Sequence, residues 1–337
     1  MRLFVAAAVL CLIAPALVAQ EAPSPDMPPP ASDAPSQPVS DMATETLKVN
    51  VNLVNLYFSA RDKNGYITNL TKADCSIAED HIPQTVKKFT QEKDLPLTIG
   101  ILLDTSGSQQ NVLPMEQSAG AEFLKDVLTP KDEAFPISFD INVNLLADYT
   151  NSPREIARAM NKAQINTGAG TGSVTGNVTP RGTLLYDAVY LAAHDKLRQE
   201  AGRKILVILT DGQDQGSQET LKSATEAAQK SNAIVYVILL ADPYAYGDFG
   251  YTGAGAMDRL AKDTGGRVIN VGRNVKKLQA AFDQIQDELR TQYLVSYTPK
   301  DLKLDGTFRT LQVDCGKDVK VQTRRGYYAM ANPLGDD

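Results

Sequence analysis

The chain has 337 residues, of which 43% are hydrophobic and 22% are charged, and this composition is typical of a globular protein. The length suggests one large domain or two to three smaller ones. The formal net charge is −6, which excludes a general attraction to nucleic acid or to anionic lipid.

The N-terminus has the pattern of a secretory signal peptide. Arg2 supplies a short positive region, residues 3–17 form an apolar run, and the small residue Ala19 follows it. Such a run is too short to span a membrane, so we predict cleavage near Ala19 and a secreted or periplasmic protein. No later segment has about 18 uninterrupted apolar residues, which predicts no transmembrane segment in the mature chain.

The next segments predict a linker and then strands. Residues 20–46 contain seven prolines among Ser, Ala, Asp and Gln. This segment buries too little apolar surface to offset the entropy of ordering it, so we predict a disordered linker. Apolar and polar residues alternate within 47–94 and again within 291–330, which predicts short β-strands. Each β-region is marginal alone, so we expect the C-terminal strands to pair with the N-terminal β-region in a small β-sandwich-like unit.

Two cysteines, Cys75 and Cys315, remain once the signal peptide is removed. In an exported protein they could form one disulfide, because pairing of the two β-regions could bring their strands together. The alternative is two buried free thiols, and the sequence leaves both open.

Between residues 95 and 290 the pattern changes to strands that alternate with helices. We predict strands at 97–103, 134–139, 142–149, 204–209, 234–240 and 267–271, and helices at 112–128, 152–163, 184–197, 218–230, 254–263 and 275–289. Nearly continuous apolar strands indicate a sheet that is buried on both faces. The predicted fold class is therefore α/β, with a mostly parallel central sheet and helices on both faces.

Oxygen-bearing side chains follow two of these strands. Asp104, Ser106 and Ser108 come directly after the first strand, and Asp211 follows the strand that ends at 209. Thr183 begins a predicted helix after a Gly-rich loop. In an open α/β sheet, ligands bind at the carboxyl ends of strands, and such oxygen ligands suit Mg²⁺. The alternative is that the carboxylates cap turns and the hydroxyls are ordinary loop groups.

The three motifs together resemble the von Willebrand factor A family. They are D-x-S-x-S at 104–108, G-T-x-L-x-D-A at 182–188 and T-D-G at 210–212. The resemblance covers about residues 95–290, and the flanking β-regions look like a bacterial secreted family described as von Willebrand factor A-related. It implies a Rossmann-like fold and a metal-ion-dependent adhesion site that binds Mg²⁺, or else Mn²⁺ or Ca²⁺.

The resemblance also implies a role for each residue of the site. Hydroxyls that match Ser106, Ser108 and Thr183 coordinate the metal directly. Carboxylates that match Asp104 and Asp211 act directly or through water. One coordination position stays open for an Asp or Glu side chain of a protein partner.

Two loops are predicted to select that partner. Residues 167–182 precede Thr183, and residues 242–251 follow the strand that ends at 240. The second loop carries four aromatic residues among glycines, a composition typical of an adaptable contact surface: Tyr244, Tyr246, Phe249 and Tyr251. The alternative is that these side chains fold back onto the domain.

Catalytic motifs are missing from the sequence. It contains neither G-x-S-x-G nor G-x-x-x-x-G-K-[ST], and its two histidines lack metal-ligand spacing. We therefore predict an exported, non-catalytic protein that binds a protein partner through a metal. The alternative is a scaffolding protein of envelope assembly, in which the metal only stabilises the loop.

Overall fold

The computed structural model describes residues 53–92, 95–166, 182–240 and 253–330. Contacts group residues 50–337 into one compact unit. The predicted signal peptide and linker lie outside the described residues, as do most of the 167–182 loop and the whole 242–251 loop. Among the described residues, no helix combines the length and the apolar character needed to cross a membrane.

A six-stranded sheet forms the centre of the α/β part, in the order β11-β10-β9-β6-β7-β8. All neighbouring strands are parallel except β7 and β8, which are antiparallel. The strands are β6 (Leu97–Asp104), β7 (Glu133–Phe139), β8 (Val143–Leu145), β9 (Arg203–Thr210), β10 (Ala233–Leu239) and β11 (Val268–Asn270). The prediction of a mixed α/β fold with a largely parallel sheet is confirmed.

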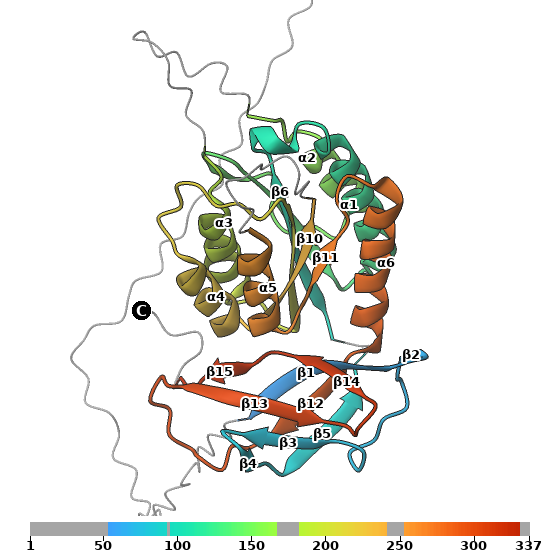
Figure 1. Cartoon of the computed structure of the whole chain (residues 1–337), viewed down its shortest axis with the longest axis vertical. Coiled ribbons are helices and arrows are strands. Elements are labelled where there is room, and N and C mark those ends of the chain that lie inside the picture. Colours follow the sequence, from blue (N-terminus) through green and yellow to red (C-terminus); the bar gives the residue numbers. More distant parts are fainter. Residues whose placement is uncertain (1–52, 93–94, 167–181, 241–252, 331–337) are drawn as a thin grey trace, which may run out of the picture. The chain divides into compact units, whose positions relative to one another are not determined.

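Helices cover both faces of this sheet (Figure 1). They are α1 (Leu113–Val127), α2 (Pro153–Met160), α3 (Leu185–Leu191), α4 (Leu221–Lys230), α5 (Gly253–Thr264) and α6 (Val275–Thr291), with a 3₁₀ turn η1 (Gly107–Gln109) and a π-helical segment η2 (Ala192–Leu197). In β6, Ile99 and Ile101 pack in the cluster of α1, α2 and α6, whereas Leu102 packs in that of α3, α4 and α5. Alternate residues of a strand point to opposite faces, so one strand serves both cores.

Steric crowding explains why a glycine, Gly100, stands in the middle of β6. A Cβ atom there would lie 2.6 Å from Leu206 Cδ2 and 2.7 Å from Phe135 Cζ, closer than atoms can pack. The absent side chain leaves room for these larger side chains of β9 and β7, which fill the core on that face.

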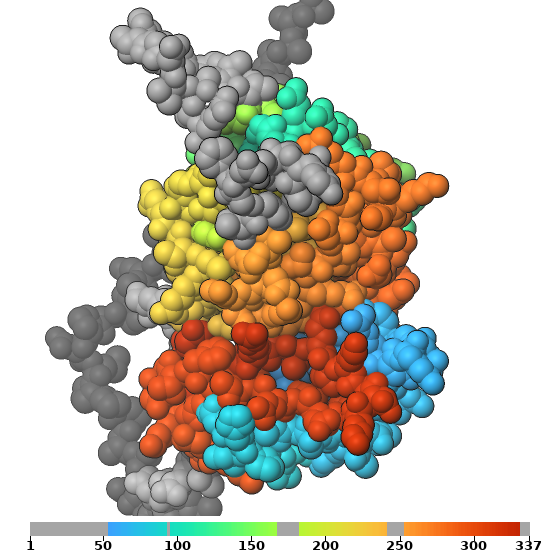
Figure 2. Space-filling view, in the orientation of Figure 1, coloured from blue at the N-terminus to red at the C-terminus, as the bar shows by residue number. Residues whose placement is uncertain are grey.

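The β-region forms two sheets from both ends of the described chain. One has the order β14-β1-β12-β5 with β2 beside β1, and the other has the order β15-β13-β3-β4. The strands are β1 (Val54–Asp62), β2 (Gly65–Tyr66), β3 (Ser76–Glu79), β4 (Ile82–Pro83), β5 (Val86–Gln91), β12 (Tyr293–Tyr297), β13 (Phe308–Asp314), β14 (Lys320–Thr323) and β15 (Gly326–Tyr328). N-terminal and C-terminal strands thus alternate in the first sheet and lie side by side in the second, and the blue, cyan and red surfaces of the β-region adjoin one another in Figure 2.

One core joins these two sheets, and a disulfide links the neighbouring strands β3 and β13 of the second sheet. Leu56 and Phe58 of β1 belong to the same buried cluster as Ile77 of β3 and Leu311 of β13. Cys75 and Cys315 form a disulfide that spans 240 residues of sequence. In the chain-entropy model, a disulfide that closes a loop of this length stabilises the folded protein by about 5 kcal/mol.

A buried glutamate connects the β-region to the α/β part. Glu288 of α6 accepts hydrogen bonds from Tyr236 of β10 (2.7 Å), Gln322 of β14 (2.6 Å) and Tyr66 of β2 (3.1 Å). It also pairs with Arg267 at 3.1 Å. A single side chain therefore links two strands of the β-region to a helix and a strand of the α/β part.

Candidate metal site

The site lies at the carboxyl edge of the central sheet, away from the β-region (Figure 1). β6 and β9 are parallel neighbours that pair up to Leu103 and Leu209, so Asp104 at the end of β6 and Asp211 directly after β9 lie at the same edge. Thr210 donates its hydroxyl to Asp104 Oδ2 at 2.6 Å. Both aspartates are buried, at 0% and 3% exposure, which places two carboxyl groups in one region of low polarity.

The loop after β6 presents its two serines beside this pair. The backbone N–H of Ser106 donates to Asp104 Oδ1 at 3.0 Å, so the aspartate fixes the loop that follows it. The hydroxyl oxygens of Ser106 and Ser108 lie 3.0 Å apart. Ser106 is buried and Ser108 is exposed. The two hydroxyls thus converge, one on the inner and one on the outer side of the loop.

Thr183 joins the edge through a two-way bridge with Gln215. Each of these residues donates its backbone N–H to the carbonyl of the other, at 2.9 and 3.0 Å. Asp187 strengthens the same junction, because its carboxylate accepts the N–H groups of Gln218 and Glu219. Thr183 itself precedes α3, which begins at Leu185, so the prediction that it starts the helix is wrong by two residues.

A tight turn that holds Asp211 follows β9. Gly212 has φ +82°, a backbone conformation that favours glycine. The carboxylate of Asp211 accepts the N–H of Gln213 at 3.0 Å. The T-D-G motif thus supplies a hydroxyl for Asp104, a second acid and the residue that allows the chain to turn.

The electrostatics of the edge favour a cation. Burial, together with the charge of Asp211, raises the pKa of Asp104 from 3.8 to about 7, although hydrogen bonds from Ser106 and Thr210 oppose this shift. Two carboxylates that repel each other beside three hydroxyls form an oxygen-only donor set, which hard divalent cations prefer. The residues present therefore fit the metal that the motifs imply.

Within the described ranges, no three Asp, Glu, His or Cys side chains come close enough to hold one metal ion together. A cation here would be held by two carboxylates, by hydroxyls and by water. Mg²⁺ matches this set, because it keeps several of its waters and takes few protein ligands.

The sequence motifs do not include two supporting residues, Asp140 and Glu116. Asp140, at the end of β7, accepts the hydroxyl of Thr105 at 2.8 Å and so anchors the metal loop to the neighbouring strand. Glu116 is fully buried in α1. A signal for Glu116 was present, because it lies three residues from Leu113 and from Ala119 on the apolar stripe of the helix.

The predicted partner-contacting residues Tyr244, Tyr246, Phe249 and Tyr251 lie outside the described residues. Their contact with a partner therefore stays a prediction.

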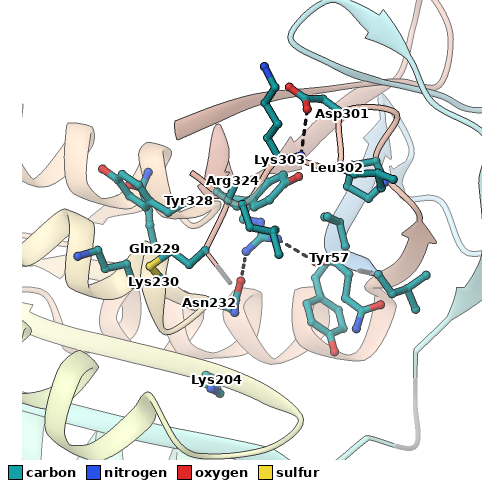
Figure 3. A pocket seen from close by; sticks show the side chains of 18 of the residues that line it. Tyr57, Lys204, Gln229, Lys230, Asn232, Asp301, Leu302, Lys303, Arg324 and Tyr328 are labelled. Atoms are coloured by element: carbon teal, nitrogen blue, oxygen red, sulfur yellow. Dashed lines mark hydrogen bonds between the residues drawn. The ribbon is translucent and has the colours of Figure 1, made fainter. Parts of the chain in front are cut away.

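A separate pocket of about 420 Å³ lies where the β-region meets the opposite edge of the central sheet. Arg324 projects into it, as Figure 3 shows, and donates to Asn232 Oδ1 and, at 2.9 Å, to the carbonyl of Asn55. Lys204 in the wall donates to the carbonyl of Arg198 at 3.1 Å. These cations are used to join protein segments, so we assign no ligand to the pocket.

Comparisons with known proteins give similar structures only. No family model matches the sequence, and no curated protein matches it. Among solved structures, BatB from Bacteroides thetaiotaomicron is similar at 17% identity over 57% of this chain and 98% of that chain, with a TM-score of 0.44. The von Willebrand factor domain of the type V pili tip protein Mfa5 from Porphyromonas gingivalis is similar at 12% identity over 58% and 95%, with a TM-score of 0.45.

A third similar structure is proximal thread matrix protein 1 from the mussel byssus, whose metal-ion-dependent adhesion site (MIDAS) motif holds zinc. It has 15% identity over 61% of this chain and 48% of that chain, with a TM-score of 0.47. These neighbours are of the von Willebrand factor A type.

Proposed function

We propose that this chain is an exported, non-catalytic protein that binds a protein partner through a divalent cation. Mg²⁺ is the cation that we propose first. The observation that carries the proposal is the buried pair Asp104 and Asp211 at a sheet edge that also presents hydroxyl groups. Ser106, Ser108 and Thr183 would supply those hydroxyls to the cation. The bound cation would act as a Lewis acid toward a carboxylate.

The charge of this donor set supports a docking role. Hydroxyl groups are neutral, so the two aspartates supply all of the negative charge among the five predicted ligands. Neutral hydroxyls donate little electron density to the cation, so it stays a good Lewis acid for an Asp or Glu side chain from outside, and this interaction strengthens where water is excluded. Ser108 is exposed, so the site is accessible from its side of the loop.

The disulfide supports export. Cys75 and Cys315 are bonded, and such bonds persist in oxidising compartments such as the periplasm and the cell exterior. The pattern of Arg2, the apolar run and Ala19 at the N-terminus agrees with this location.

Calorimetric titration with Mg²⁺ tests the metal site first. The wild-type protein should bind the ion. Asp104→Ala and Asp211→Ala should each abolish binding while the circular dichroism spectrum is retained. Asp126→Ala is the matched control, because Asp126 is an exposed acid of α1 and its loss should not alter binding. Equal Mg²⁺ affinity in all four proteins would contradict the site.

Crosslinking capture from the native envelope tests partner binding. A partner should be captured with Mg²⁺, and capture should be lost with chelator or in Asp104→Ala. The scaffolding alternative predicts that Mg²⁺ raises the melting temperature without changing capture. Recording both quantities along one Mg²⁺ titration therefore distinguishes docking from scaffolding.

A further inference from the structure

Glu116 is a buried carboxyl group without a partner. It lies in the first turn of α1 at 0% exposure. Neither of its carboxyl oxygens has a hydrogen-bond partner. A buried charge is expensive unless it is paired or hydrogen-bonded, and the described residues supply no hydrogen bond to this carboxyl.

The backbone ties Glu116 to the metal loop. The N–H of Gln109 donates to the carbonyl of Ser106 (3.0 Å), that of Val112 to Gln109 (2.9 Å), and that of Glu116 to Val112 (3.0 Å). Gln109 is 1% exposed, and its Oε1 atom also lacks a partner. Unsatisfied acceptors thus occur twice along the short segment that leads from the serines into α1.

The charges around Glu116 point to the same site. Burial raises its pKa well above the ordinary range, and the charges of Asp104 and Asp211 raise it further. These three acids are nevertheless not close enough to hold one ion together. The three acids therefore do not form one group of ligands, and a water molecule would connect Glu116 to the cation.

We infer that the carboxylate of Glu116 is an outer-sphere positioning group of the metal site, which accepts hydrogen bonds from water bound to the cation. This inference rests on the proposed metal site. Mg²⁺ and Mn²⁺ keep water in their coordination shells, and the water hydrogens need acceptors. Groups that act through a ligand in this way commonly change metal affinity by about 10- to 100-fold.

Mn²⁺ binding, followed by electron paramagnetic resonance at one fixed pH, tests the inference. Glu116→Gln keeps the size of the side chain and removes its charge, and we expect affinity to fall by about 10- to 100-fold. Glu116→Asp retains a carboxylate and should recover part of the loss. Glu122→Gln, an exposed change on the same helix, should bind as the wild type does.

Water-proton relaxation of the bound Mn²⁺ supplies a second readout. Loss of an acceptor for metal-bound water should change the relaxation rate in Glu116→Gln, which a purely structural role would not. If that variant does not fold, Glu116→Met replaces it, because removing an unpartnered carboxyl deletes no hydrogen bond. The variant in use must show wild-type circular dichroism in chelator.

The outcomes separate the two proposals. If the wild type binds no Mn²⁺, the metal site is wrong and the inference fails with it. If the wild type binds Mn²⁺, Asp104→Ala does not, and Glu116→Gln binds within twofold of the wild type with unchanged relaxation, only the inference is overturned.

Discussion

Buried glutamates occur in two regions of the molecule. One region is the β-region with its junction to the α/β part, the other is the metal edge, and the glutamates have different surroundings in the two. Glu79 of β3 accepts hydrogen bonds from Tyr297 at 2.6 Å and Tyr327 at 2.9 Å, and pairs with Arg309 at 3.4 Å. Glu288 at the junction is satisfied in the same way. Glu116, buried to the same degree, has no hydrogen-bond partner on either oxygen.

The difference separates groups that hold the fold from groups that await a ligand. A buried acid whose hydrogen bonds the protein itself supplies is part of the structure, and removing it leaves its partners unsatisfied. A buried acid without partners contributes nothing to the fold by hydrogen bonding. A cation at the metal site would explain why such an acid is buried there.

The largest expected effect is at the junction. Glu288→Ala removes the ion-pair partner of Arg267 and the acceptor of two tyrosine hydroxyls, and we expect the free energy of unfolding to fall by about 3–5 kcal/mol. Urea denaturation with chelator present measures this. Asp287→Ala, an exposed neighbour on α6, is the control and should change stability by less than about 0.5 kcal/mol. A small effect at Glu288 would show that its contacts do not hold the two parts together.

The next effect is the dependence of stability on pH in the metal-free protein. The folded protein raises the pKa of Asp104 from 3.8 to about 7 through burial and the charge of Asp211, so the folded state binds the proton more tightly than the unfolded state. Stability therefore falls as pH rises from about 4 to 7, by up to about 4 kcal/mol at 1.4 kcal/mol per pH unit.

Saturating Mg²⁺ should flatten this pH dependence, and Asp104→Asn should reduce it in chelator. Urea denaturation at pH 4.5, 6 and 7.5 measures it. If stability in chelator rises over this pH interval in both the wild type and Asp104→Asn, repulsion and burial of the aspartates do not destabilise this edge.

The smallest effect is expected at Glu116. Without metal, Glu116→Gln should leave the free energy of unfolding unchanged or raise it by up to about 1 kcal/mol, because no hydrogen bond is lost and a buried charge is removed. The same denaturation experiment in chelator measures this. A loss of 2 kcal/mol or more would make Glu116 a structural residue like Glu288, and the contrast between the two regions would disappear.

The sequence predicted the α/β part well where strong periodicity and loop chemistry agree. The apolar runs at 97–103 and 204–209 coincide with β6 and β9, because a strand buried on both faces is apolar at most of its positions. The order of the three motifs predicted one edge, since parallel strands end together. Boundaries were weaker: the predicted helix at 184–197 is α3 followed by a π-helical segment, a change in hydrogen-bond register that periodicity cannot show.

By itself, the sequence determined the donor types, their spacing and the strands that carry them, because these follow from local pattern. Only the tertiary structure decided which groups are satisfied. It paired Cys75 with Cys315 across 240 residues, surrounded Glu288 with donors from β2, β10 and β14, and left Glu116 without any. Hydrogen-bond satisfaction depends on which distant side chains converge, and no local pattern contains that information.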